Sequence, residues 1–244
     1  MKQILITTYN KKLYDEYAHQ LVDTFIQTNQ LLPLYVFTED DTAKFPKRNG
    51  VTYINLFEEE PESLRFKERN KGKPVGVFFE DAVRFSYKVF AQSAARKYGD
   101  KVYYVDSDCK FISQIPWQWY KDCLPDETFL SFYNRHGQYT ETGFVAFNHT
   151  REVSDEFMTE YKRWYLEDSV YNIEIKGKNF WTDCHTLDRT RQMFKERENY
   201  TEKSLGDGRH GHIMARDRFI RPYLDHRKGA RKYKQWSPEW RKNI

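Results

Sequence analysis

Cysteine and long apolar runs are scarce in this sequence, and each absence excludes a class of protein. Its three cysteines are too few and too scattered for a disulfide framework, and they lack zinc-ligand spacing (Cys109, Cys123 and Cys184). No segment reaches the roughly 20 apolar residues that cross a bilayer. The first predicted strand begins at Ile4, which leaves no room for a signal peptide. We therefore expect a cytoplasmic protein without a membrane span.

Aromatic residues, in contrast, make up 17% of the 244 residues, beside 39% hydrophobic and 31% charged residues. This length suits one α/β domain, and the aromatic content argues against disorder. Much of the core must consist of Tyr, Phe and Trp, whose polar tips also suit a sugar-binding surface. The net charge of +4 permits an anionic partner without requiring one.

Strand and helix patterns alternate along the first half of the chain. Short apolar runs predict strands at 4–8, 34–37 and 51–56. Between the first two, apolar residues four apart predict an amphipathic helix (Leu13, Tyr17, Leu21 and Phe25). This β-α-β order predicts an α/β domain with a mostly parallel sheet flanked by helices.

The same reading continues through the second half. We expect a helix over 83–98, strands at 102–105, 129–133 and 143–148, and a helix over 153–164. The charged stretch 58–76, with Pro61, Gly72 and Pro74, predicts a long surface loop. The glycine-rich stretch 203–212 also predicts a loop, in which His210 and His212 are either lid residues or part of a mobile polar segment.

The sharpest local signal is Asp106-Ser107-Asp108 at the carboxyl end of a predicted strand. Ligands of open α/β sheets bind at that edge, and side chains two apart on an extended backbone point the same way. Two carboxylates there suit Mg²⁺ or Mn²⁺, which would stabilise charge on a departing diphosphate. An ordinary acidic turn is the alternative.

A second signal lies near the carboxyl terminus, where His226, Gly229 and Lys232 stand three apart. An imidazole would complete the metal shell and favour Mn²⁺ over Mg²⁺. Gly229 would let the backbone approach a phosphate, and Lys232 would add a positive charge. A basic tail with a surface histidine is the alternative.

Together these motifs resemble the GT-A glycosyltransferases of the glycogenin and lipopolysaccharide-galactosyltransferase group. That family has a strand-end D-x-D and a late H-x-x-G-x-x-K, although its usual Pro-Trp is replaced here by Tyr233 and Lys234. The resemblance spans residues 4 to 232. It implies one Rossmann-like GT-A domain over 1–244, with a nucleotide-binding half (1–108), an acceptor half (109–225) and a basic carboxyl-terminal segment (226–244).

The resemblance also implies roles for individual residues. It implies that Thr8, Tyr9, Asn10 and Tyr14 hold the nucleoside of a UDP-type nucleotide sugar, and that Arg84, Lys88, Ser107, Gly143, Gly229 and Lys232 line the rest of the donor site. Asp183 or Asp188 would hold sugar hydroxyls or the acceptor, although Asp183 as a helix cap is an equal alternative. The family implies a retaining outcome, and we name no catalytic base.

The acceptor is a separate question. Residues 82–90 and 141–144 resemble compact glycosyltransferases of tailed bacteriophages, some of which modify hydroxymethylated bases in DNA. The protein would then act in the host cytoplasm. Its basic residues would contact DNA phosphates, both those at positions 216, 218, 221, 227, 228, 231, 232, 234, 241 and 242 and those at positions 67, 69, 71 and 73. A surface glycan or a protein is the competing acceptor.

Two functions of other classes also fit parts of the pattern. A nucleotidyltransferase shares the fold and the acidic pair, but Thr7 to Lys12 contains no glycine for a phosphate loop. A non-catalytic module that binds DNA or glycans is the other alternative, and it has no need of Asp106, Asp108 and His226 together. The sequence predicts no oligomeric state.

Overall fold

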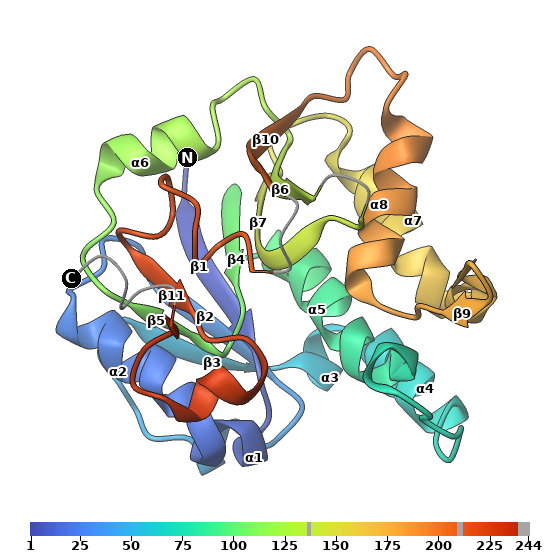
Figure 1. The fold of residues 1–244 in the computed structure, drawn as a ribbon, viewed down its shortest axis with the longest axis horizontal. Helices are drawn as coiled ribbons and strands as arrows, with labels where there is room; N and C mark the ends of the chain where they lie inside the picture. The colour runs from blue at the N-terminus through green and yellow to red at the C-terminus, as the bar shows by residue number, and fades with distance from the viewer. Residues whose placement is uncertain (136–137, 209–211, 239–244) are drawn as a thin grey trace.

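The computed structural model describes residues 1–135, 138–208 and 212–238. Its centre is a seven-stranded sheet in the order β10-β6-β7-β4-β1-β2-β3 (Figure 1). Only β7 runs antiparallel to its neighbours. The predicted mostly parallel α/β fold is confirmed. The strands are β1 (Gln3–Thr8), β2 (Leu34–Thr38), β3 (Val51–Asn55), β4 (Lys101–Val105), β6 (Leu130–Arg135), β7 (Glu141–Asn148) and β10 (Glu202–Gly208).

Helices cover both faces of this sheet, because buried side chains alternate along its strands. In β1, Ile4 and Ile6 join one core cluster with α5, α7 and α8, while Leu5 joins the opposite cluster with α2 and α6. In Figure 1, α7 and α8 lie on the right and α2 on the lower left. These helices are α2 (His19–Gln27), α5 (Ala82–Ala95), α6 (Trp117–Cys123), α7 (Ser154–Leu166) and α8 (Asp183–Phe194).

The stretch 58–76 is largely helical, so the predicted long loop is wrong. It contains the end of α3 (Leu56–Glu59) and all of α4 (Pro61–Arg69). Pro61 occupies the first turn of α4, where its missing N–H is not needed, so it begins the helix instead of interrupting the chain. Phe66 is fully buried, and this contact stabilises a segment whose other residues are mostly charged.

The predicted loop at 203–212 is also wrong over most of its length. Residues 202–208 form β10, which pairs parallel to β6. Its glycines serve close packing: a Cβ at Gly206 would lie 2.7 Å from Asp217 Oδ2, and one at Gly208 would lie 2.8 Å from Ile213 Cδ1. His210 and Gly211 lie outside the described residues.

A small second sheet positions the site. Its antiparallel strands are β5 (Cys109–Phe111) and β11 (Leu224–His226), with His226 opposite Cys109. The remaining elements are α1 (Lys11–Leu13), the π-helical η1 (Tyr14–Ala18), the hairpin β8 (Glu174–Ile175) and β9 (Lys178–Asn179), and 3₁₀ turns η2 (Thr42–Lys44), η3 (Phe78–Glu80), η4 (Ser169–Asn172) and η5 (Gly229–Tyr233). Among the described residues, no helix is long and apolar enough to span a bilayer.

Candidate metal and nucleotide site

Asp106 and Asp108 lie on a tight turn between β4 and β5. The Cys109 amide donates to the Asp106 carbonyl oxygen at 3.0 Å, which closes the turn. We expected the two carboxylates to point the same way because they lie two apart on an extended strand. That reason is wrong, because the backbone is not extended at these residues. The turn itself brings both side chains to one side, at the carboxyl end of β4.

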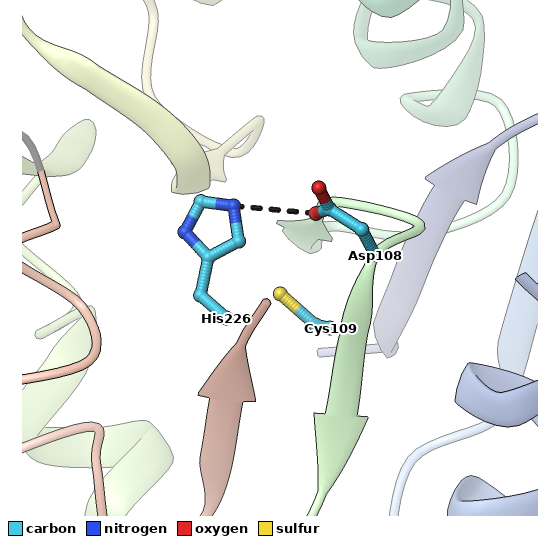
Figure 2. Close-up of side chains that lie close together, drawn as sticks. All are labelled: Asp108, Cys109 and His226. Carbon is cyan, nitrogen blue, oxygen red and sulfur yellow. Dashed lines mark ion pairs between the residues drawn. The ribbon is translucent and has the colours of Figure 1, made fainter. Parts of the chain in front are cut away.

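His226 reaches the same point from the other end of the chain. Its Nε2 atom lies 3.3 Å from Asp108 Oδ1 and 3.5 Å from Asp106 Oδ2. The β5–β11 pairing fixes this approach, and Figure 2 shows the imidazole of His226 facing the Asp108 carboxylate, with Cys109 beside them. We call Asp106, Asp108 and His226 the carboxylate–imidazole site.

The donor set fits a divalent cation. Asp108 Oδ1 and His226 Nε2 are both buried and make no hydrogen bond. Neighbouring ligands about 2.1 Å from an octahedral ion are about 3 Å apart, close to the spacing found here. Burial lowers the pKa of His226, but Asp108 and Asp106 raise it to about 9, so an imidazolium would compensate the carboxylates until a cation displaces its proton.

Cys109 is a weaker ligand candidate than Asp106. Its sulfur groups with Asp108 and His226 at metal-binding distances. Burial raises the pKa of this thiol well above its usual value, and the nearby carboxylates raise it further. A protonated thiol is a poor ligand, and hard cations such as Mg²⁺ and Mn²⁺ prefer oxygen.

Lys88 connects the site to Asp183. Its ammonium lies 2.8 Å from Asp106 Oδ1 and 3.0 Å from Asp183 Oδ2. Burial lowers the pKa of Lys88, but these two carboxylates raise it well above its usual value, so the lysine stays charged. Asp183 is fully buried at the start of α8, where Thr182 occupies the cap position, so the alternative of Asp183 as the helix cap is wrong.

A second buried charge cluster lies beside the first. Both oxygens of Glu141 on β7 are paired: Arg135 binds Oε2, Lys228 Nζ lies 3.1 Å from Oε2, and the Gly143 amide donates to Oε1 at 3.0 Å. Burial raises the pKa of Glu141, but Lys228 and Arg135 outweigh it and lower the pKa to about 2. We call Arg135, Glu141 and Lys228 the Glu141 cluster; the sequence predicted only a phosphate contact for Lys228 and no pairing among the three.

Gly143 lies where the two clusters meet. A Cβ at this residue would lie 2.6 Å from His226 Cε1 and 2.9 Å from Met214 Sδ. Its carbonyl oxygen also accepts from the Asp106 amide at 2.8 Å. Glycine therefore lets the imidazole pack against β7, and this residue supports the carboxylate–imidazole site and is not among the residues that line the cavity.

One cavity of about 920 Å³ contains most of the predicted site. Its lining includes Asp106 and Asp108 of the acidic turn, and His212, Asp183 and Glu39 also contribute to it. The predicted residues that line it are Thr8, Tyr9, Asn10, Arg84, Lys88, Asp106, Ser107, Asp108, Asp183, Gly229 and Lys232.

The 3₁₀ turn η5 contacts Tyr17, another residue that lines this cavity. The Lys232 ammonium lies 4.4 Å from the centre of the Tyr17 ring, and Tyr17, Ser107 and Lys232 all line the cavity. Gly229 has a φ of +67°, a left-handed conformation that glycine adopts without strain. The late motif therefore lies beside the acidic turn although more than 100 residues separate them in the chain.

Two predicted residues lie elsewhere. Tyr14 is buried against Tyr9 and Phe45 and does not line the cavity. Asp188 hydrogen bonds with Thr140 and pairs with Arg191 at 3.1 Å, and it lines a separate cavity of about 740 Å³. Of the two acidic candidates, only Asp183 reaches the cavity that holds the carboxylate–imidazole site.

Part of the basic stretch faces inward. Arg227 is fully buried, and its Nη1 donates to Gln20, at 2.7 Å, and to two carbonyl oxygens of the following segment. Lys228 pairs with Glu141. These two residues are therefore unavailable for the DNA contacts expected of them, and Arg241 and Lys242 lie outside the described residues.

Comparisons by sequence and by structure give different results. No protein-family profile matches the sequence, and no curated protein matches it either. Among solved structures, the apo form of mouse xyloside xylosyltransferase 1 is similar, with a TM-score of 0.52, 11% identity, and coverage of 84% of this chain and 85% of that one. Glycosyltransferase GlyE of Streptococcus pneumoniae TIGR4 is also similar, with a TM-score of 0.48 and 16% sequence identity. The match covers 84% of this chain and 45% of GlyE, so this chain spans about half the length of GlyE. The chain thus has the fold of a GT-A glycosyltransferase, and at this identity the likeness concerns the fold alone.

Proposed function

We propose that this protein is a metal-dependent, retaining glycosyltransferase that moves a sugar from a nucleoside-diphosphate donor to an acceptor hydroxyl. The observation that carries the proposal is the approach of His226 Nε2 to within 3.5 Å of both Asp106 and Asp108, whose side chains line a 920 Å³ cavity. Such a cavity has the size of a small-molecule site. The fold shared with a glycosyltransferase agrees with this assignment.

The roles follow from position along the cavity. Asp106, Asp108 and His226 would hold Mn²⁺ or Mg²⁺, which when bound stabilises negative charge on the leaving diphosphate. Arg84 and Lys232 also line the cavity and would supply positive charge for the same phosphates. Asp183 Oδ1 is buried without a hydrogen-bond partner, so it is placed to accept from a sugar hydroxyl. Lys88 fixes Asp183 relative to the carboxylates.

For the acceptor, we favour a surface glycan or a protein over a hydroxymethylated base in DNA. A DNA acceptor would need a continuous basic surface, because phosphate contacts supply most of the affinity. Arg227 and Lys228 face inward, which removes two cations from that surface. Steep weakening of DNA binding as salt rises would reverse this preference.

Donor hydrolysis across a panel of nucleotide sugars tests the proposed function. We expect turnover with Mn²⁺, less with Mg²⁺, and none after EDTA treatment. A nucleoside diphosphate at about 100 times its Kd should raise stability by about 2.7 kcal/mol, which corresponds to a rise in Tm of about 5–10 °C. The proposal is wrong if no donor is turned over and no nucleotide raises Tm in the presence of metal.

A further inference from the structure

Asp106 uses its two carboxylate oxygens for different partners. Oδ1 lies 2.8 Å from the Lys88 ammonium, and it accepts a hydrogen bond from the Tyr104 hydroxyl at 3.1 Å. Oδ2 lies 3.5 Å from His226 Nε2. The inference drawn from this asymmetry rests on the proposed function, because it concerns what aims Asp106 at the cation of the carboxylate–imidazole site.

Tyr104 lies on the same strand as the carboxylate that it binds. It stands on β4 two residues before Asp106, and β4 is an interior strand of the central sheet. Its side chain is 1% exposed, packs in the core cluster that contains residues of α5, and also contributes to the lining of the cavity. A close-packed ring on an interior strand has little freedom to move, so its hydroxyl is in place before any ligand binds.

Lys88, the other partner of Oδ1, is supported by the same ring. Its ammonium lies 5.3 Å from the centre of the Tyr104 ring, within the range of a cation–π contact. This ammonium also pairs with Asp183 Oδ2 at 3.0 Å, so it is shared between two carboxylates. A phenol has one proton to donate, and Tyr104 donates it to Asp106.

The two partners of Oδ1 restrict how the Asp106 carboxylate can turn. The last torsion of an aspartate side chain is broad, so an unrestrained carboxylate presents either oxygen or both to a cation. Rotation here would take Oδ1 away from both the Tyr104 hydroxyl and the Lys88 ammonium. Oδ2 therefore stays near His226 Nε2, which also lies 3.3 Å from Asp108 Oδ1.

We propose that Tyr104 is a positioning residue of the metal site, whose hydroxyl holds Asp106 so that Oδ2, and not Oδ1, binds the cation. Tyr104 is not itself a ligand in this arrangement, because its proton is committed to Oδ1. Hydrogen bonds of this kind orient the carboxylates that bind metals, and their loss typically costs 10- to 100-fold in metal affinity.

Binding of Mn²⁺ to the full chain, without nucleotide, tests this proposal. Tyr104→Phe removes the hydroxyl and keeps the ring beside Lys88, so the calorimetric affinity for Mn²⁺ should fall by about tenfold. The EPR spectrum of the bound Mn²⁺ should change as well, because a carboxylate that turns alters the set of ligand oxygens. Calorimetry gives the affinity separately from the number of competent sites, so a partly unfolded preparation still reports the affinity of the folded protein.

Tyr165→Phe is the matched control. Tyr165 is fully buried in the same core cluster, and its hydroxyl hydrogen bonds with Thr186 at 3.4 Å instead of with Asp106. The substitution removes the same atom from a similar environment, so it should leave both the Mn²⁺ affinity and the EPR spectrum unchanged.

The outcomes separate the two proposals. If the wild type binds Mn²⁺ and Tyr104→Phe binds it equally tightly, or more weakly with an unchanged spectrum, positioning by Tyr104 is wrong while the proposed function stands. An equal loss of affinity in Tyr165→Phe also overturns it, because the effect would then be one of core packing. If the wild type binds no Mn²⁺, with or without a nucleoside diphosphate, both proposals fall.

Discussion

Two buried charge clusters share one wall of the cavity, and they differ in how their polar atoms are paired. In the Glu141 cluster, two cations and a backbone amide bind both oxygens of one carboxylate. In the carboxylate–imidazole site, two carboxylates face one imidazole, and Asp108 Oδ1 and His226 Nε2 have no hydrogen bond. Both clusters tie residues 226–228 to the central part of the chain.

The difference indicates what each cluster is for. Buried polar groups are normally hydrogen-bonded, so a carboxylate–imidazole ion pair that is buried without hydrogen-bond geometry has the chemistry of a ligand set for a cation. Removing one partner from a paired cluster costs stability, since it leaves the others buried without compensation. We therefore expect changes in the carboxylate–imidazole site to affect metal binding and turnover, and changes in the Glu141 cluster to affect folding. The following predictions test that division.

Asp108→Asn should have the largest effect on activity. It replaces a ligand carboxylate by an amide of the same shape, so donor turnover should fall about 10³-fold, or about 4 kcal/mol in transition-state stabilisation. Steady-state donor hydrolysis in Mn²⁺ measures this loss. Tm in EDTA should stay the same or rise, because one of two facing carboxylates is removed; a fall of several degrees would mean that Asp108 is structural.

Glu141→Gln should act mainly on stability. It leaves Arg135 and Lys228 buried without their carboxylate, so the free energy of unfolding should fall by about 3 kcal/mol in urea titrations. The folded-state pKa of about 2 lies below the ordinary value of 4.5, so Glu141 stabilises the wild type above pH 4.5, and this contribution is lost as pH falls toward 2. The variant should lose less stability than the wild type over that interval. Equal acid sensitivity in both proteins would contradict the pairing.

Gly143→Ala should have the smallest effect. It tests the position where the two clusters meet. The added Cβ would meet His226 Cε1 at 2.6 Å and displace the imidazole, so Mn²⁺ affinity should fall about 10- to 100-fold by calorimetry. Overpacking should also cost about 1–3 kcal/mol of stability. Gly208→Ala is the matched control, because its Cβ would meet Ile213 at 2.8 Å; the same loss of Mn²⁺ affinity there would argue against a local effect.

Periodicity and strand-end position predicted much of the fold and half of the site. The alternation of apolar runs predicted the mostly parallel sheet, and Asp106 and Asp108 were found because they follow a buried strand directly. Local pattern failed for α4, because one buried Phe66 outweighs many charged neighbours. It failed for β10 because glycines that permit close packing against Asp217 and Ile213 look like loop residues in a sequence.

The residues that the sequence left without a role depend on contacts between distant segments. Glu141 lies on a strand buried along its whole length, and a buried glutamate is rare unless paired, so this signal was present. Its partners Arg135 and Lys228, in contrast, lie far apart in the chain, at the end of β6 and just after β11, and the pairing of all three could not be assigned by spacing.

The sequence by itself determined the chain order of six of the seven strands of the central sheet, the acidic turn after β4, and the late histidine motif, since each depends on neighbours within a few residues. The tertiary structure decided which of these groups meet. The β5–β11 pairing brings His226 opposite Cys109 and therefore beside Asp108 and Asp106. Hydrogen-bond register between strands more than 100 residues apart sets that meeting, and spacing within the chain does not encode it.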